Sequence, residues 1–129
     1  TYKTQMEAAR KGIVTQEMKE VAYHEGMDLK DLSSLLSSGQ VVIPANVKHK
    51  SLEPKGIGAG LRTKINVNLG VSGDCADYSE EMEKANLAIR CGAESIMDLS
   101  NYGKTRDFRT TLINMSPERM LFKNSSQSV

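Results

Sequence analysis

An alternation of strand and helix patterns in the second half of the chain restricts the possible folds more than any other feature. Short apolar runs predict strands there, and apolar positions at helical spacing between capping residues predict helices. The predicted elements are a strand over 63–69, a helix from Asp77 or Ser79 to about Cys91, a strand over 94–99 and a helix from Thr105 to Pro117. This order predicts parallel strands joined by helical crossovers. Because parallel strands normally belong to larger sheets or barrels, we expect an α/β architecture that is truncated.

A helical and irregular region precedes this alternation. Its predicted helices begin at the capping residues Thr4, Thr15 and Asp28 and end near Gly12, Gly26 and Gly39. The run Val41–Ile43 predicts a short strand, and residues 44–62 predict a loop. The positions expected to face a core are Met18, Val21, Ala22, Leu29, Leu32, Leu35 and Leu36, followed by Met82, Ala85, Ala88, Ile89, Phe108, Leu112 and Ile113. The sequence therefore predicts an N-terminal helical and loop region over 1–62, βα units over 63–117, and a divergent, disordered tail over 118–129. Within that tail, residues 120–122 leave a short strand open as an alternative.

Composition excludes several classes of partner and location. Basic and acidic residues nearly balance, 17 against 16, so no general affinity for nucleic acid is expected. No apolar run reaches the roughly 18–20 residues that a membrane span needs, and the first residues resemble no secretory signal, so no membrane partner is expected. The two cysteines, Cys75 and Cys91, are too few for a disulfide framework, which favours a reducing, cytoplasmic setting. The acidic residues Glu80, Glu81 and Glu83 are interpreted as a solvated helix face that complements the helix dipole.

Polar residues on the predicted strands are the candidates for a binding site. Asn66 and Asn68 fall on the same face of their strand, where asparagine is uncommon. Their hydrogen-bond partners could come from a ligand or from neighbouring backbone. Asp98 lies in an apolar run and must be paired or coordinated, and a structural pair with Arg62, Lys64 or a backbone amide explains it equally well. The chain offers no recognisable catalytic residue and no histidine or cysteine spacing typical of a metal site.

Several segments together resemble the N-terminal part of the phosphomethylpyrimidine synthase (ThiC) family. They are QMEAARKGIVTQEM at 5–18, VIPAN at 42–46, GAGLRTKINVNLG at 58–70 and GAESIMDLS at 92–100. They occur in the family's order and extend over about 4–117. The resemblance implies a radical S-adenosylmethionine enzyme that rearranges 5-aminoimidazole ribonucleotide on a (β/α)8 barrel. It implies that the strands at 63–69 and 94–99 are the first two of that barrel.

The resemblance also implies a substrate site, cofactors and a quaternary structure. Asn68 corresponds to the second asparagine of the family's first strand, and Met97 to the methionine before Asp-Leu-Ser; both are expected to bind substrate. S-adenosylmethionine, a [4Fe–4S] cluster and zinc are implied for the full-length family, with none of their ligands identified in this chain. A homodimer is implied for the full-length protein.

One part of the family pattern is missing. The resemblance leads us to expect a tyrosine in a Gly-Thr-Val-Pro-x-Tyr motif on the third strand, but the chain has MLFKNSS at 120–126. The family's metal-binding histidines and its three-cysteine cluster motif are absent as well. The sequence is therefore interpreted as a truncated or frame-altered member of the family, with a foreign tail after about Pro117. We expect the 129-residue chain alone to be inactive.

The resemblance leaves the product open. After Asp-Leu-Ser, where thiamine-pathway members usually continue with Thr-Gly, this chain has NYGKTRDFR at 101–109. That difference, with Val67 in place of a common alanine, favours the related 5-hydroxybenzimidazole synthases of anaerobic cobalamin lower-ligand synthesis. The alternative is phosphomethylpyrimidine synthase of thiamine biosynthesis. A further alternative is a non-catalytic module that binds a partner through its unpaired strand edges.

Overall fold

The chain divides into two compact units, which are described separately. The computed structural model describes residues 1–46, 48, 52–115 and 120–123. Unit 1 comprises residues 1–50 and 54–63, and unit 2 comprises 51–53 and 64–129. The sequence predicts a division after residue 62, and the contacts place it after residue 63. No helix among the described residues has the length and apolar character needed to cross a membrane.

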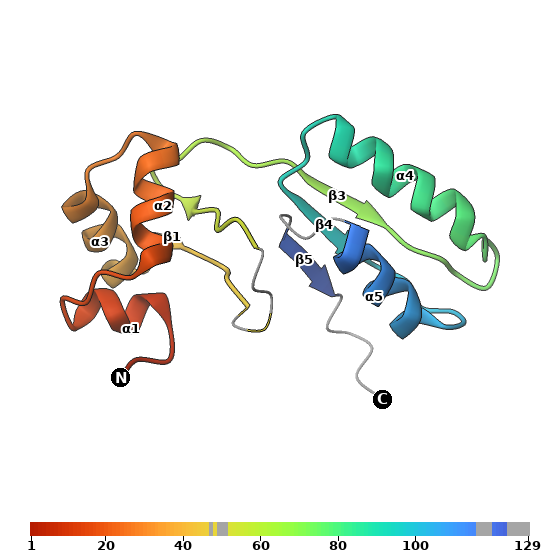
Figure 1. Ribbon diagram of the computed structural model, residues 1–129, viewed down its shortest axis with the longest axis horizontal. Helices are drawn as coiled ribbons and strands as arrows, with labels where there is room; N and C mark the ends of the chain where they lie inside the picture. Colours follow the sequence, from red (N-terminus) through yellow and green to blue (C-terminus); the bar gives the residue numbers. More distant parts are fainter. Residues whose placement is uncertain (47, 49–51, 116–119, 124–129) are drawn as a thin grey trace. The chain divides into compact units, whose positions relative to one another are not determined.

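Unit 1 is built on three short helices whose ends follow the capping signals of the sequence (Figure 1). They are α1 (Gln5–Arg10), α2 (Gln16–Glu25) and α3 (Leu29–Ser38). The side chains of Thr4, Thr15 and Asp28 accept hydrogen bonds from backbone amides in the first turn of the helix that each precedes. The glycines Gly26 and Gly39 end α2 and α3 in the left-handed conformation. The predicted start of each helix is confirmed.

The core of unit 1 lies between these helices and a short hairpin-like strand pair. Its buried residues are Ala8, Ala9, Met18, Val21, Ala22, Leu32, Leu36, Val41 and Ile43. Strand β1 (Val41–Val42) pairs antiparallel with β2 (Ile57–Gly58). Strand β2 lies inside residues 44–62, which the sequence predicts to be rich in loops. A side chain at Gly58 would place its Cβ 2.1 Å from the carbonyl oxygen of Gln40, so only glycine allows the chain to approach this closely.

Unit 2 contains a parallel sheet with the strand order β3-β4-β5 (Figure 1). The strands are β3 (Asn66–Leu69), β4 (Ser95–Asp98) and β5 (Met120–Lys123). The first two are shorter than predicted but lie within the predicted ranges. The third lies within the predicted tail, at the place where the sequence leaves a short strand open, and its residues pair in register with β4. The remaining tail residues, 118–119 and 124–129, lie outside the described part of the chain.

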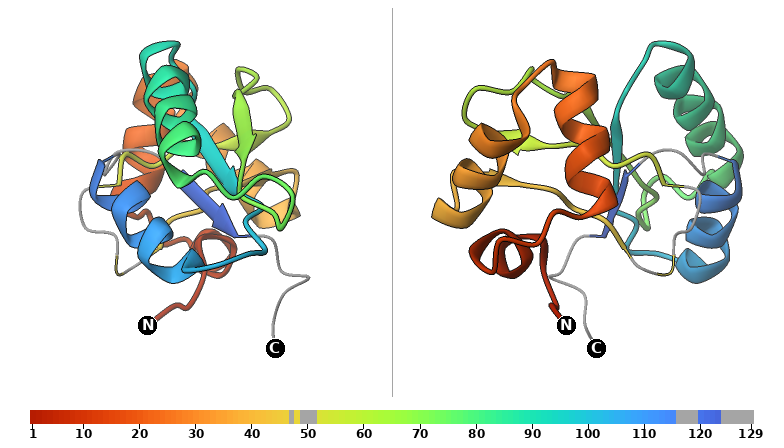
Figure 2. Two further views of the ribbon diagram at one scale, coloured as in Figure 1. Left: turned by 90° about the vertical axis from the view of Figure 1, so that its right-hand side faces the viewer. Right: turned by 60° about the vertical axis from the view of Figure 1, so that its left-hand side comes forward.

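Two helices cover one face of this sheet. Figure 2 shows α4 (Tyr78–Arg90) and α5 (Thr105–Met115) on the same side of the strands. The buried cluster between helices and sheet contains Leu69, Ala85, Ile96, Phe108 and Leu112. The prediction that Ile113 faces the core is wrong, because its side chain is 39% exposed. The α/β class is confirmed for this unit, with one face of the sheet packed against helices.

Candidate functional site

The two residues predicted to bind substrate lie side by side on adjacent strands. Asn68 of β3 and Met97 of β4 are register partners, and Asn66 is the partner of Ser95 two residues earlier on each strand. Partners in a parallel pair point to the same face of the sheet, and successive residues along a strand point to opposite faces. Leu69 belongs to the cluster under the helices, so Asn68 and Met97 project from the opposite face. Asn68 is exposed and Met97 is partly exposed, which leaves both accessible.

A chain of hydrogen bonds connects the polar side chains of this face. The hydroxyl of Ser95 donates to Oδ1 of Asn66 at 2.7 Å. Nδ2 of Asn66 donates to Oδ1 of Asn68 at 2.8 Å. Two of the three side chains, Asn66 and Asn68, are exposed, whereas Ser95 is buried. The asparagines therefore do not lie in an apolar interior, and part of their hydrogen bonding is satisfied by each other rather than by backbone.

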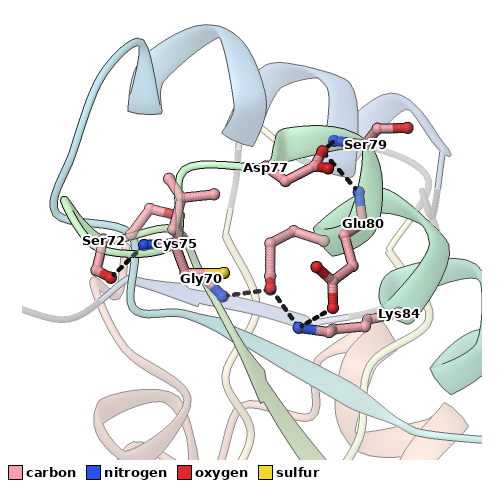
Figure 3. Close-up of polar contacts among 10 residues, drawn as sticks. Gly70, Ser72, Cys75, Asp77, Ser79, Glu80 and Lys84 are labelled. Atoms are coloured by element: carbon pink, nitrogen blue, oxygen red, sulfur yellow. Dashed lines mark hydrogen bonds and ion pairs between the residues drawn. The ribbon is translucent and has the colours of Figure 1, made fainter.

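A buried carboxylate fixes the turn that follows β3. Oε2 of Glu81 accepts a hydrogen bond from the backbone amide of Gly70 at 2.7 Å, and Lys84 donates to its Oε1 at 2.6 Å. Figure 3 shows Gly70 and Lys84 close to the start of α4, where Asp77 caps the helix. Glu81 is 4% exposed, so its interpretation as part of a solvated face is wrong. Its spacing to Ala85 and Ala88, which are buried on the same helix, is the sequence signal that could have identified it.

The contacts of Lys84 predict a pH dependence of stability. Its hydrogen bond to Glu81, assisted by Glu80, raises the pKa of the Lys84 ammonium above its ordinary value. A raised pKa in the folded state gives stability that is present below the unfolded pKa, about 10.4, and is lost as pH rises through the folded pKa. We expect Lys84→Arg, whose cation stays protonated, to lose less stability than the wild type between neutral pH and about pH 11. Urea unfolding across this range measures the difference, and identical pH profiles would contradict the assignment.

Asp98 is a structural residue held by an arginine that the sequence analysis did not identify. It is fully buried, and its Oδ1 accepts a hydrogen bond from the backbone amide of Ser100 at 2.9 Å. Nε of Arg109, on α5, donates to its Oδ2. The predicted backbone amide is confirmed, but among the described residues the cation is Arg109 rather than Arg62 or Lys64. Arg109 lies three residues before buried Leu112, which places it near the apolar side of its helix.

The described residues do not supply a metal or cluster site. No group of three or more His, Cys, Asp or Glu side chains among them could hold a metal ion. Cys75 lies in the loop before α4 and Cys91 at the C-terminal end of that helix, and both are exposed free thiols. The residues of this segment therefore do not fit an iron–sulfur cluster or a zinc ion.

Comparison with known proteins identifies the family. The model of the radical SAM ThiC family matches residues 4–121, which is nearly the whole chain. The chain belongs to the radical SAM ThiC family. Its match extends past Pro117 into β5, so the prediction of foreign sequence after that position is wrong for residues 118–121.

Curated relatives from clostridia agree with this assignment. The chain is 63% identical over 116 residues to a phosphomethylpyrimidine synthase of Clostridium botulinum (strain 657 / Type Ba4). It is 60% identical over 116 residues to a phosphomethylpyrimidine synthase of Clostridioides difficile (strain 630). These alignments include 90% of this chain but only 26% and 27% of the two relatives. The chain therefore spans about a quarter of the length of the relatives it matches, and none of the matches specifically supports the 5-hydroxybenzimidazole subgroup.

Proposed function

We propose that the full-length protein is a phosphomethylpyrimidine synthase that converts 5-aminoimidazole ribonucleotide to 4-amino-5-hydroxymethyl-2-methylpyrimidine phosphate. The observation that carries this proposal is the 60–63% identity to curated phosphomethylpyrimidine synthases over 116 residues. Support from the structure comes from Asn68 and Met97, which share one accessible face as register partners. A ribonucleotide on that face would be within reach of both side chains.

The proposed setting of this face is the interior of a (β/α)8 barrel. Strands β3, β4 and β5 run parallel, and α4 and α5 pack on the same face of them. In a barrel of this kind, helices lie outside and the opposite face of every strand points inward. Ligands bind at the carboxyl ends of the strands, and Asn68 and Met97 lie near those ends. The proposal assigns these strands to the beginning of such a barrel.

Asn68 and Met97 have different tasks in this proposal. The amide of Asn68 would hydrogen-bond polar atoms of the ribonucleotide, and the thioether of Met97 would pack against its apolar surface. S-adenosylmethionine and an iron–sulfur cluster supply the radical chemistry of the family. The described residues of this chain include no group of three or more His, Cys, Asp or Glu side chains that could hold the cluster. Zinc binding and a homodimer are proposed for the full-length protein from the family resemblance alone.

One observation keeps a second product under consideration. The sequence NYGKTRDFR at 101–109 differs from the usual thiamine-pathway pattern and favours 5-hydroxybenzimidazole. Two residues of this stretch have structural tasks that need no difference in product. The carbonyl oxygen of Tyr102 accepts a hydrogen bond from the hydroxyl of Tyr78 at 2.5 Å, and Arg109 pairs with Asp98. These contacts weaken the argument for the benzimidazole subgroup.

The test is product identification with the full-length protein. The protein is reconstituted under anaerobic, reducing conditions with S-adenosylmethionine and 5-aminoimidazole ribonucleotide, and the products are identified by mass spectrometry. We expect the pyrimidine phosphate. Formation of 5-hydroxybenzimidazole would replace the proposal with the second candidate, and ribonucleotide that neither binds nor reacts would favour a non-catalytic module.

A substitution tests whether this face takes part. We expect Asn68→Ala to lower kcat/KM about 10- to 100-fold, because a hydrogen bond to a polar substrate atom is worth roughly 1–3 kcal/mol. The matched control is Asn86→Ala, at an exposed position on α4. Equal kcat/KM of the Asn68→Ala and Asn86→Ala variants would show that Asn68 does not contact the substrate.

A further inference from the structure

The hydrogen-bond chain from Ser95 through Asn66 to Asn68 has a direction. Ser95 is 3% exposed, and its hydroxyl hydrogen is donated to Oδ1 of Asn66. If the oxygen and nitrogen of the Asn66 amide exchanged places, its NH2 group would face the Ser95 oxygen. The hydroxyl hydrogen of Ser95 would then need another acceptor. Among the described residues, the bond to Asn66 is the hydrogen bond that the structure gives this hydroxyl to donate, and a turned amide would lose it. Because an unsatisfied buried donor is costly, the direction from Ser95 to Asn66 is favoured.

The direction at Ser95 fixes the orientation of the next two amides. With Oδ1 of Asn66 turned toward Ser95, its NH2 group turns toward Asn68 and donates to Oδ1 of that residue. The NH2 group of Asn68 then has no hydrogen-bond partner within residues 1–46, 48 and 52–115. This exposed donor lies on the same sheet face as Met97.

We propose that Ser95 and Asn66 are positioning residues that orient the amide of Asn68, so that its NH2 group is presented to a hydrogen-bond acceptor on the ligand. The acceptor is a phosphate or hydroxyl oxygen or an unprotonated ring nitrogen, since these atoms accept hydrogen bonds from an amide NH2. The identity of the ligand as 5-aminoimidazole ribonucleotide rests on the proposed function. The orientation of the amide rests only on the contacts among the three residues.

A pair of charge-matched substitutions separates the two possible directions. Asn68→Asp keeps the oxygen that accepts from Asn66 and loses only the donors that face the ligand. Asn66→Asp keeps the oxygen that accepts from Ser95 but cannot donate to Asn68, whose amide must then turn its NH2 toward the new carboxylate. If the hydrogen bonds ran the other way, from Asn68 to Asn66, the results would be exchanged. Asn66→Asp would then leave the bond between residues 66 and 68 as it is, and Asn68→Asp would force the amide of Asn66 to turn.

The first measurement needs no substrate. In the chain labelled with ¹⁵N at asparagine, the side-chain NH2 of Asn66 is expected to show slow exchange with water and a shifted resonance from its hydrogen bond, and that of Asn68 is expected to exchange freely. The Asn66 signal is expected to persist in Asn68→Asp. A protected NH2 on Asn68 instead, or loss of the Asn66 signal in Asn68→Asp, would overturn the proposed orientation.

The second measurement uses the full-length protein and 5-aminoimidazole ribonucleotide. We expect Asn66→Asp and Ser95→Ala to raise KM about 3- to 10-fold with a smaller change in kcat, since each disturbs one substrate hydrogen bond through Asn68. Ser95→Thr keeps the hydroxyl and is expected to restore KM. Unchanged KM in both Asn66→Asp and Ser95→Ala would overturn the positioning role. If the wild type binds no ribonucleotide while the NMR pattern holds, the proposed function fails and the amide orientation stands.

Discussion

Gly70→Ala is expected to reduce the free energy of unfolding by roughly 2–5 kcal/mol. Gly70 follows β3 directly and has a φ of +152°, in a region that residues with side chains rarely adopt. An added Cβ would lie 2.5 Å from the backbone nitrogen of Ser100 and 2.7 Å from the carbonyl carbon of Leu99. These are backbone atoms of the two residues that directly follow β4, so relief would require the chain after β3 and the chain after β4 to separate. Urea unfolding followed by circular dichroism measures the loss.

Gly92→Ala is the matched control for this substitution. Gly92 also has a positive φ, +85°, but an added Cβ would meet no atom within 4 Å. It should cost only the backbone strain of the left-handed region, about 1–2 kcal/mol. If both variants lost the same stability, the close approach of the two strands at Gly70 would not be the cause.

Asp98→Asn is expected to destabilise the protein by about 2–4 kcal/mol, since removing one partner of a buried ion pair leaves the other uncompensated. The new amide could still accept from Ser100, but its NH2 group would face the guanidinium of Arg109. Arg109 has a side chain that is 20% exposed, so water compensates part of the loss. The loss should appear in β4, next to Met97, and hydrogen exchange of the β4 amides measures it.

The control for Asp98 is another aspartate on the neighbouring helix. Asp107 lies on α5 but is exposed, so Asp107→Asn removes the same charge without breaking a buried pair. We expect it to change stability by less than about 0.5 kcal/mol. Comparable destabilisation by both substitutions would mean that net charge, and not the contact with Arg109, stabilises β4.

Local signals in the sequence were sufficient for the helices and for the nearness of the two site residues. Thr15 and Asp28 cap helices as their residue types predict, since a cap depends on atoms only a few residues away. Asn68 and Met97 lie at equivalent positions on consecutive parallel strands. The strand–helix–strand order is therefore enough to predict that the two residues are neighbours. Family motifs added the expectation that both bind substrate, which stays a prediction.

Contacts distant in sequence could not be predicted in the same way. The sequence predicts Glu81 to be a surface charge because the Gly70 amide that it binds lies eleven residues away, at the end of the preceding strand. Arg109 was missed as the partner of Asp98 for a similar reason, since only the packing of α5 on the sheet brings the two together. The sequence leaves strand β5 open rather than predicting it, because a short strand is stabilised by its neighbour β4 more than by its own residues.

The account depends on Asn68 and Met97 being two sides of one ribonucleotide site. The most direct test is a crystal structure of the full-length protein with 5-aminoimidazole ribonucleotide bound. We predict that Nδ2 of Asn68 donates a hydrogen bond to the ribonucleotide while Met97 packs against it from the adjacent strand. A ribonucleotide bound away from this face, in contact with neither residue, would contradict the account.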